Sequence, residues 1–576
     1  MLGKERTSTM PTAGHERLCH APPRRELGAG SSEYAILTPC SLLPAPCSLL
    51  PFSLIVVAVA TFGLCGCTSL SDYVHHGFKV GPEYTAAKAT VAPQWIDAAD
   101  RRVRSDPADL SRWWTVFNDP LLNDLVYRAY TQNITLKEAG ARILQARASM
   151  AIAKGELFPQ TQNLSGNYAA TEASAVPFLP TLPKFFDQWN FDFNLAWELD
   201  FWGRFRRAVR ASDAQLDYAV EDYDAALVTL VGDVATNYVQ MRQTQEQIAL
   251  AKQNVKLQTD VLKIVQARLD AGRATELDVD QAQATLSQTK ATIPQFEIVL
   301  RESQNAICTL LGMPPADLQS RLGERPIPPA PVEAVVGIPA QLLERRPDIR
   351  RAERAAAVQS EQIGIAEAEW YPHISIVGTL GYSTSGQGLS QLFTPANQAG
   401  AIGPSFQWNI LNYGRIAANV RLQDAKFQQS LLTYRATVLN ASQEAENGLV
   451  TYLKAQNQAK ELRDGVIAAN KAYSIVVSQY EVGRVDFTTV STIEITLVTE
   501  QNLYAQALGQ IDMGLIQVYR ALGGGWQIRL GPGYASGLPP PTGAPPGAEN
   551  KRLPTPGLEA TTPPATNPEP IPPPGP

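Results

Sequence analysis

The residues from Trp189 to Phe201 alternate at every step between large apolar side chains and polar or small ones. Successive side chains of a β-strand point to opposite faces, so this segment predicts one apolar and one polar face. A strand with lipid on one side and water on the other needs such alternation over about 9–11 residues. A half-buried strand of a soluble sandwich is the alternative, but large apolar residues at seven alternate positions in a row are more than one core face usually offers. The lipid-facing residues predicted here are Trp189, Phe191, Phe193 and Trp197.

The same alternation returns between Ile402 and Ile410, where it places Phe406 and Trp408 on the apolar, lipid-facing side. Trp197 and Trp408 are 211 residues apart, and this offset relates further pairs along the chain: Gly203 with Gly414, Arg204 with Arg415, Gly272 with Gly483, Arg273 with Arg484, and Leu311-Gly312 with Leu522-Gly523. A constant offset over so many positions indicates a tandem duplication whose copies have kept their length.

Each repeat has a second strand upstream. Apolar and polar residues also alternate after Pro159 and after Pro372, and each proline ends the helix before it. The sequence therefore predicts two strands per repeat and four per chain. The loops expected at 171–188 and 384–399 are rich in Pro, Ser, Thr and Gly, as is typical of exposed loops. Asp200 falls at a polar position and is expected to face the lumen of the barrel.

Long helices are predicted between the strand pairs, because 204–271 and 415–482 contain no proline and few glycines. Nearly seventy helical residues span on the order of 100 Å, far more than a globular domain. Shorter helices are expected over 121–157, 276–311, 347–371 and 488–522. Gly272 and Gly483 suit left-handed caps at the ends of the long helices.

A 4-3 heptad of apolar and small residues runs through both long helices and predicts coiled-coil packing. A dimeric coiled-coil rod would share this heptad, but a rod does not need amphipathic strands at its end. The inward positions predicted in the second repeat are Tyr434, Val438, Ala441, Ala445, Gly448, Tyr452, Ala455, Ala459, Leu462, Val466, Ala469, Tyr473, Val476 and Tyr480. Those predicted in the first repeat are Leu227, Val234, Met241, Ile248, Val255, Leu262 and Leu269.

The N-terminal region predicts export and lipidation. An apolar run at 54–64, of signal-peptide size, precedes Cys65-Gly66-Cys67. These residues resemble a bacterial lipobox, with Cys67 as the acylated N-terminus of the mature chain; an ordinary secretory signal is the alternative. The mature chain would keep only Cys67 and Cys308, so no disulfide framework is expected.

The chain shows no candidate catalytic chemistry. It has no glycine-rich phosphate loop and no Cys/His spacing for a metal, and we expect no cofactor and no enzymatic activity. His75 and His76 could bind a metal ion, but a tether beside the anchor is the expected role. The net charge of −6 gives no reason to expect nucleic-acid binding.

Five stretches with a recognisable sequence run in order over about 67–525: Lys79–Tyr84, Trp113–Leu122, Trp197–Arg204, Ile338–Ile349 and Gly403–Ile410. In this order and with the duplication, the chain resembles the TolC-like outer membrane efflux proteins, and within them the NodT-type lipoprotein branch that serves resistance-nodulation-division pumps.

The resemblance implies a mixed fold: a twelve-stranded outer-membrane barrel, built as a homotrimer, that continues as an α-helical coiled-coil barrel through the periplasm. It implies a passive export duct for small molecules, lipid-anchored in the cell outer membrane, with a periplasmic adaptor and an inner-membrane pump as partners. The expected organisation is a signal or extension at 1–66, a lipidated tether at 67–112, repeats at 113–325 and 347–525, a linker at 326–346 that joins an outer belt, and a disordered, proline-rich tail at 526–576. An exit duct for type I protein secretion, an envelope adhesin and an outer-membrane enzyme are the alternatives.

The turns after the long helices lie farthest from the barrel, and the resemblance implies that this end is the periplasmic gate. Candidate gate residues are Arg273, Glu276, Asp278, Asp280, Arg484, Asp486 and Thr488. The family carries an aperture leucine and a lower aspartate where this chain has Thr488 and Thr492, so Asp486 and Glu494 become the nearest acidic substitutes. We hypothesise that Arg273 or Arg484 pairs with an acidic group on a neighbouring helix and holds the aperture shut; solvated turn residues are the alternative.

Overall fold

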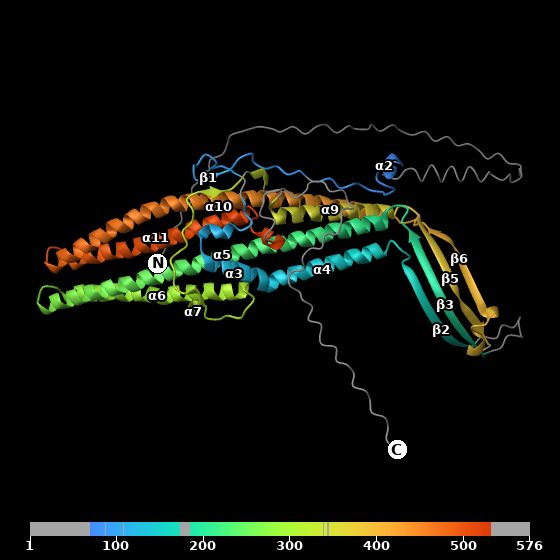
Figure 1. The fold of residues 1–576 in the computed structure, drawn as a ribbon, viewed down its shortest axis with the longest axis horizontal. Helices are drawn as coiled ribbons and strands as arrows, with labels where there is room; N and C mark the ends of the chain where they lie inside the picture. The colour runs from blue at the N-terminus through green and yellow to red at the C-terminus, as the bar shows by residue number, and fades with distance from the viewer. Residues whose placement is uncertain are drawn as a thin grey trace, which may run out of the picture. The chain divides into compact units, whose positions relative to one another are not determined.

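Two repeats of equal design form the body of the chain (Figure 1). The computed structural model describes residues 70–531 except 87, 107–108, 173–184, 338, 342–344 and 387. The first repeat contains α4 (Ile134–Gly155), β2 (Thr161–Glu172), β3 (Phe185–Leu199), α5 (Arg204–Asp270) and α6 (Glu276–Leu310). The second contains α9 (Pro347–Ala368), β5 (His373–Ser385), β6 (Gln398–Gln407), α10 (Arg415–Glu481) and α11 (Phe487–Ala521). Because α5 and α10 have 67 residues each and α6 and α11 have 35 each, the predicted duplication is confirmed.

The four predicted strands form one antiparallel sheet in the order β2-β3-β5-β6. Two boundaries were predicted wrongly. β3 already begins at Phe185, inside the loop expected at 171–188, and β6 ends at Gln407, which leaves Trp408 one residue beyond the strand. The loop between β5 and β6 contains two short 3-10 helices, η3 (Leu389–Gln391) and η4 (Pro395–Asn397).

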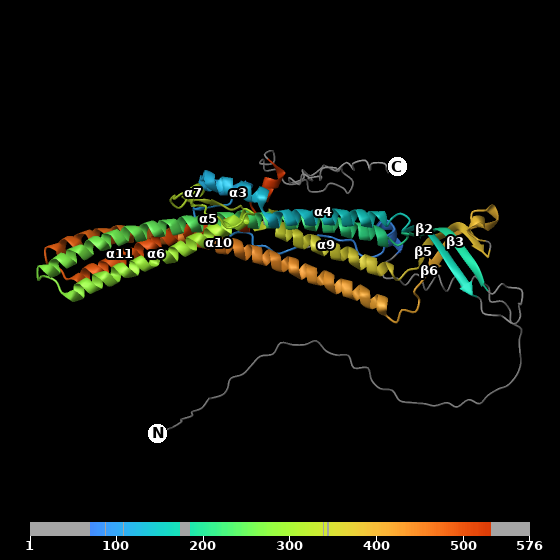
Figure 2. The same cartoon turned by 90° about the horizontal axis from the view of Figure 1, so that it is seen from below.

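The helices lie side by side along α5 (Figures 1 and 2). In the half of the body next to the sheet, the helices lie in the order α4, α5, α9, α10. In the half that ends at the turns after α5 and α10, they lie in the order α6, α5, α11, α10. In α10 the predicted heptad is confirmed, since all its positions except Leu462 and Val466 are buried. In α5 it holds from Leu227 to Ile248, after which the buried positions move to Asn254, Gln258, Val261 and Val265.

The helix predicted over 121–157 is two helices, α3 (Pro120–Gln132) and α4, and this prediction was wrong. They meet at Asn133, whose side chain accepts a hydrogen bond from the amide of Leu136 at 2.8 Å. Asparagine is a preferred N-cap, so the break has a local cause.

A belt of short elements covers the middle of α5. It consists of β1 (Val103–Arg104), η1 (Trp113–Phe117), α3, α7 (Gln319–Leu322), β4 (Ala334–Val335), η2 (Pro339–Gln341) and η5 (Trp526–Leu530). β1 pairs in parallel with β4, which joins the N-terminal segment to the inter-repeat linker. Trp113, Trp114 and Phe117 are buried in the main apolar core together with Val231 and Tyr238 of α5.

The predicted start of the tail at 526 was also wrong. The Trp526 indole donates a hydrogen bond to the carbonyl of Arg345 at 3.2 Å, and Arg529 makes two hydrogen bonds of 2.7 Å to buried Asp224. Residues 526–530 are therefore part of the folded body. The disorder predicted for the tail concerns 532–576, which lie outside the described residues, as do 1–66 and Cys67.

The segment before the belt begins with α2 (Leu70–His75) and runs along the helices. Tyr84 donates a hydrogen bond to Glu353 of α9, and the indole of Trp95 to the carbonyl of Gly337. Among the described residues, none of the helices combines the length and the apolar character needed to cross a membrane.

Candidate functional site

The sheet has two chemically different faces. On one, aromatic and aliphatic residues of neighbouring strands lie opposite each other, as Phe191 does with Tyr382, and Phe193 with both Leu164 and Leu380. On the other, Asn190 accepts a hydrogen bond from Ser383 at 2.7 Å and Asn194 accepts one from Thr379 at 3.0 Å. The arrangement has the two faces that the alternation predicts. Which face meets lipid stays a prediction for Trp189, Phe191, Phe193, Trp197, Phe406 and Trp408.

Two of these tryptophans also tie the sheet to the helices. The indole of Trp197 donates to the carbonyl of Leu157 after α4, at 3.2 Å, and that of Trp408 donates to the carbonyl of Trp370 after α9, at 3.0 Å. The repeats thus use equivalent residues at both joints between helix and strand. Alternation alone could not reveal this second role.

Asp200 does not fit its predicted place in the lumen. Its carboxylate accepts hydrogen bonds from the backbone amides of Phe205 and Arg206, at 3.0 and 2.9 Å, and pairs with the Arg206 side chain at 2.9 Å. A carboxylate there satisfies amides at the start of α5, where the helix dipole favours a negative charge. Asp200 is a helix cap at the base of the sheet, and the lumenal prediction was wrong.

The outer edges of the sheet are open. In the part of the chain that the structure describes, β2 pairs only with β3 and β6 only with β5, so each presents an unpaired row of backbone groups. Such an edge is a template for another strand.

The turns between the long and short helices place the candidate gate residues in two groups. Asp278 and Asp486 have local roles: Asp278 forms a capping box with Thr275, and Asp486 caps α11 through the amide of Thr489 at 2.9 Å. Arg273, Glu276, Asp280, Arg484 and Thr488 are exposed. Within the described residues neither Arg273 nor Arg484 forms an ion pair, so their pairing with another chain stays a prediction.

The cross-link between the two turns comes from an arginine that the sequence did not indicate. Arg268, in the last turn of α5, donates to the carbonyl of Tyr480 at the end of α10 and lies 4.4 Å from the centre of the Tyr480 ring. It also donates to the carbonyl of Arg273 at 3.3 Å. Its basic character near a helix C-terminus was the available signal, but Tyr480, its partner in the other repeat, is 212 residues away in the sequence.

Glu494, expected as an acidic substitute at the aperture, lies inside the wall. It is 4% exposed, between Gln258 of α5 and Tyr473 of α10, and burial raises its pKa to about 7. The same contact between α5 and α11 contains the buried pair Asn254 and Gln501, 2.8 Å apart. We call the contact formed by these four residues of α5 and α11 (Asn254, Gln258, Glu494 and Gln501) the polar seam. Asp512 of α11 is also buried, near Tyr452 of α10, and burial raises its pKa to about 8.

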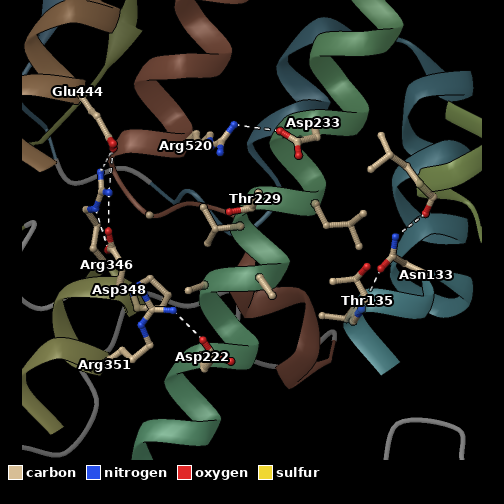
Figure 3. A pocket seen from close by; sticks show the side chains of 18 residues that line it. Asn133, Thr135, Asp222, Thr229, Asp233, Arg346, Asp348, Arg351, Glu444 and Arg520 are labelled. Carbon is tan, nitrogen blue, oxygen red and sulfur yellow. Dashed lines mark hydrogen bonds and ion pairs between the residues drawn. The ribbon is translucent and has the colours of Figure 1, made fainter. Parts of the chain in front are cut away.

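A cavity of about 490 Å³ opens on the face of α5 that the belt leaves uncovered (Figure 3). Asp222, Thr229 and Asp233 line it from α5, on the side of the helix opposite Val231 and Tyr238. Arginine and carboxylate side chains alternate around it: Arg351 pairs with Asp222 at 2.6 Å and Arg520 with Asp233 at 3.0 Å. The uncovered face of this helix therefore carries charged groups among apolar residues such as Ala225 and Val228.

Two equivalent joints flank this cavity. The side chain of Asn133 donates to the carbonyl of Leu310 at the end of α6, and Arg346 donates to the carbonyl of Ala521 at the end of α11, both at 2.8 Å. Arg346 also pairs with Glu444 of α10 at 2.9 Å. Each repeat thus links the end of its distal short helix (α6 or α11) to the start of the short helix next to the sheet (α4 or α9).

Comparison with known proteins places this arrangement in a family. The family model described as outer membrane efflux protein matches residues 125–313 and 338–524, which are the two repeats. The chain belongs to the outer membrane efflux protein family. Its function follows: it is the outer membrane channel of an efflux system, not an enzyme.

Individual relatives cover most of the chain. It is 28% identical over 463 residues to nodulation protein T of Rhizobium leguminosarum bv. trifolii, covering 80% of this chain and 95% of the relative. It is 31% identical over 440 residues to the pyoverdine export outer membrane protein OpmQ of Pseudomonas aeruginosa, covering 74% of this chain and 89% of OpmQ. The structure of the outer-membrane channel OprN matches with a TM-score of 0.72 at 32% identity, covering 78% of this chain and 99% of OprN. These likenesses confirm the predicted family and fold.

Among the described residues no group of three or more His, Cys, Asp or Glu side chains could hold a metal ion. His75 hydrogen-bonds the carbonyl of Ser71 at 2.7 Å, and His373 pairs with Glu198 at 2.8 Å at the base of the sheet.

Proposed function

We propose that three copies of this chain form one duct, in which β2 of each chain pairs with β6 of the next. The two open edges of the sheet support this arrangement. Backbone groups at an open edge cannot be satisfied in lipid, so a sheet that spans a membrane must close into a barrel. Four strands cannot enclose a pore, whereas three chains supply twelve.

The helices beside those edges support the same closure. α4 exposes Leu144 and Ile152, and α10 exposes Leu432 and Leu439. Large apolar side chains exposed along a helix mark contact surfaces. In a closed ring α4 and α6 of one chain would cover α10 of the next and bury these residues.

As the exit component of a tripartite pump, the duct would be passive. An inner-membrane pump of the resistance-nodulation-division type would supply the energy through a periplasmic adaptor, and small molecules would be the cargo. The family membership and the pyoverdine export name of OpmQ support this class of cargo. Acylation of Cys67 would anchor the chain in the outer membrane.

The gate is proposed at the turns, with opening by separation of the hairpin α5–α6 from the hairpin α10–α11. The polar seam and Arg268 join these hairpins, so both would act against opening. This assignment replaces the latch first expected from Arg273 or Arg484 alone.

The closure is tested by disulfide trapping between the two edge strands. Cysteines are placed in pairs, one at Asn163 or Ser165 of β2 and one at Ser405 or Gln407 of β6. We expect at least one pair to give a covalent trimer under oxidation in membranes, while each single-cysteine parent stays monomeric in denaturing gels. Covalent dimers without trimers, or no cross-links from any pair, would contradict the proposed ring.

The anchor is tested separately by mass spectrometry of the mature N-terminus. An acylated Cys67 is expected, lost in Cys67→Ser and kept in Cys65→Ser, since Cys65 would leave with the signal peptide. Cleavage elsewhere, or an unmodified Cys67, would remove lipidation from the account while leaving the trimer untouched.

A further inference from the structure

A basic hollow of about 680 Å³ lies where the N-terminal segment passes over the start of α5. Its lining includes three side chains with a full positive charge, Lys79, Arg206 and Arg210, and a single carboxylate, Glu83. His75 and His76 complete the polar lining. Neither the gate nor the closure of the ring uses these residues.

The hollow lies at the base of the sheet. Leu157, which lines it, is followed four residues later by the first residue of β2, and Arg206 is in the first turn of α5, soon after β3 ends. Because the sheet is the membrane-spanning part of this channel, its base marks the inner boundary of the outer membrane. The hollow therefore lies beside the inner leaflet; α2, whose His75 lines it, is at the sheet end of the helices (Figure 1).

An apolar rim stands next to the hollow. Val74, Phe78 and Phe201 are each about half exposed, at 50%, 55% and 50%. The Tyr73 hydroxyl donates to the carbonyl of Phe201 at 2.8 Å, which fixes α2 against the end of β3. Phe78 has a φ of +60°, a left-handed conformation that is unfavourable for a bulky residue. The fold thus holds this ring outward at a conformational cost.

The basic residues of the lining differ in how many of their nitrogen atoms already have partners within the fold. Lys79 pairs with Glu83 at 3.0 Å. Arg206 pairs with Asp200 and donates to the carbonyls of Gly77 and Phe78 at 2.7 Å, so it is committed to the fold.

Arg210 and His76 can each make further hydrogen bonds. Arg210 contacts Glu83 through one nitrogen at 2.7 Å, and its side chain remains 47% exposed. Nδ1 of His76 is buried and has no hydrogen-bond partner. A guanidinium and an imidazole nitrogen are suited to an anionic oxygen, and the guanidinium can bind phosphate through two nitrogens.

We propose that this hollow binds the phosphate of an anionic phospholipid of the inner leaflet, with Arg210 and His76 as its ligands and Phe78 and Val74 against the acyl chain. Basic side chains beside exposed aromatic residues at a membrane boundary are the combination that recognises such lipids. The site rests on the membrane location of the sheet and holds whether or not Cys67 is acylated. It would fix the height of the channel in the membrane.

The test is native mass spectrometry of the full-length channel in detergent, titrated with phosphatidylglycerol or with phosphatidylcholine. Saturable binding of one phosphatidylglycerol per chain is expected, with at least a fivefold preference over phosphatidylcholine. Arg210→Gln should lower the affinity about tenfold, which corresponds to about 1.4 kcal/mol. Arg210→Lys should retain part of the affinity, because it keeps the charge.

The duplication supplies a matched control. Arg421 is the equivalent of Arg210 at the offset of 211, is exposed on α10 and is not one of the residues that line this hollow. Arg421→Gln should therefore leave lipid binding unchanged. Phe78→Ser should weaken binding of phosphatidylglycerol, whereas Phe393→Ser, at the other end of the sheet and 59% exposed, should not.

Three outcomes would overturn the proposal. Equal losses in Arg210→Gln and Arg421→Gln would show non-specific attraction to charge. Equal binding of both lipids would remove the role of the head-group charge. Inorganic phosphate that binds as tightly as the lipid and is indifferent to Phe78→Ser would identify a phosphate site and not a lipid site. The covalent trimer between β2 and β6 is measured independently, so failure here and failure of the duct are distinguishable.

Discussion

The two contacts that α11 makes with the long helices differ in chemistry. Against α10, within its own repeat, the backbones come so close that a Cβ at Gly514 would lie 2.8 Å from the amide nitrogen of Tyr452. Against α5, in the other repeat, the contact contains the polar seam, with Asn254 hydrogen-bonded to Gln501 at 2.8 Å, followed by an apolar cluster that includes Val261 and Leu497. One helix thus packs tightly against its own repeat and partly through polar side chains against the other.

The difference identifies which contact can part. Close packing of backbone and apolar side chains is lost outright when two helices separate. A hydrogen bond between amide side chains is exchanged for bonds to water, so its net contribution is only about 0.5–1.5 kcal/mol. We therefore expect each hairpin to behave as a rigid unit and the polar seam to be where the hairpins move apart.

The largest effect is expected at Glu494. Burial raises its pKa from 4.5 to about 7, so the closed seam binds the proton more tightly than the separated helices do. The stabilisation by protonated Glu494 is fully present below about pH 4.5 and is lost as the pH rises through about 7. The free energy of unfolding would fall by roughly 3 kcal/mol at most.

Glu494→Gln keeps the side chain neutral and should remove this dependence. Circular dichroism at pH 5 and pH 8 should show a midpoint of thermal unfolding that falls with pH in the wild type and falls less in the variant. Glu500→Gln, six residues further along the same helix, is the control and should follow the wild type. A variant that parallels the wild type at both pH values would show that Glu494 is not the buried acid described here.

A somewhat smaller effect is expected from the packed contact. A Cβ at Gly448 would lie 2.9 Å from the backbone nitrogen of Val518, which cannot move without shifting α11. Gly448→Ala should destabilise the protein by about 2 kcal/mol despite the better helix propensity of alanine.

Gly465 of the same helix is the control, since a Cβ there would meet only the flexible carboxylate end of Glu500. Gly465→Ala should be neutral or slightly stabilising in chemical denaturation. Equal destabilisation by both substitutions would mean that the close approach at Gly448 does not distinguish this contact.

The distal end of the contact between the repeats should respond to Arg268. Its removal takes away the hydrogen bond to the Tyr480 carbonyl and the contact with the Tyr480 ring, together worth on the order of 1–2 kcal/mol. Arg268→Ser should raise the conductance of the channel in planar bilayers. Arg273→Ser, at an exposed position without an ion pair in the described part of the chain, should change it less; the opposite ranking would restore the latch first predicted from the sequence.

The smallest effect is expected within the polar seam itself. Replacing both Asn254 and Gln501 with leucine removes a buried hydrogen-bonded pair without leaving an unpaired group, which can be nearly neutral for stability. The double variant should unfold within about 1 kcal/mol of the wild type, yet open less readily, because its seam would no longer be wetted easily. A double variant that conducts as the wild type does would show that the polarity of the seam does not affect opening.

Local patterns were sufficient to predict the strands, the long helices and the duplication. Alternation around Trp197 and Trp408, and the offset between Gly203 and Gly414, depend only on neighbouring residues and chain length. The capping glycines at Gly272 and Gly483 were also predictable, and both have positive φ in the structure.

Several failures involve contacts that the hydrophobic and polar pattern does not contain, some of them with residues distant in the sequence. Asp200 is at a polar position of the alternating pattern, but its carboxylate accepts a hydrogen bond from a backbone amide at the start of α5, a few residues later. Glu494 is at a position that an aperture would suit, yet the helices α5 and α10 on either side bury it. The sequence placed Trp526 and Arg529 at the start of the tail, because their partners, Arg345 and Asp224, are more than 180 residues away.

The central claim, that this channel opens by parting of its two repeats along the polar seam, is tested most directly by a disulfide that joins α5 to α11 beside the seam. A Cβ at Gly509 would lie 3.2 Å from Cγ of Gln243, close enough for a bond after Gln243→Cys and Gly509→Cys. The double variant should give a low, closed conductance in planar bilayers when oxidised and recover wild-type openings when a reductant is added, while either single variant conducts normally throughout. Openings of wild-type size and frequency in the fully oxidised double variant would contradict the account.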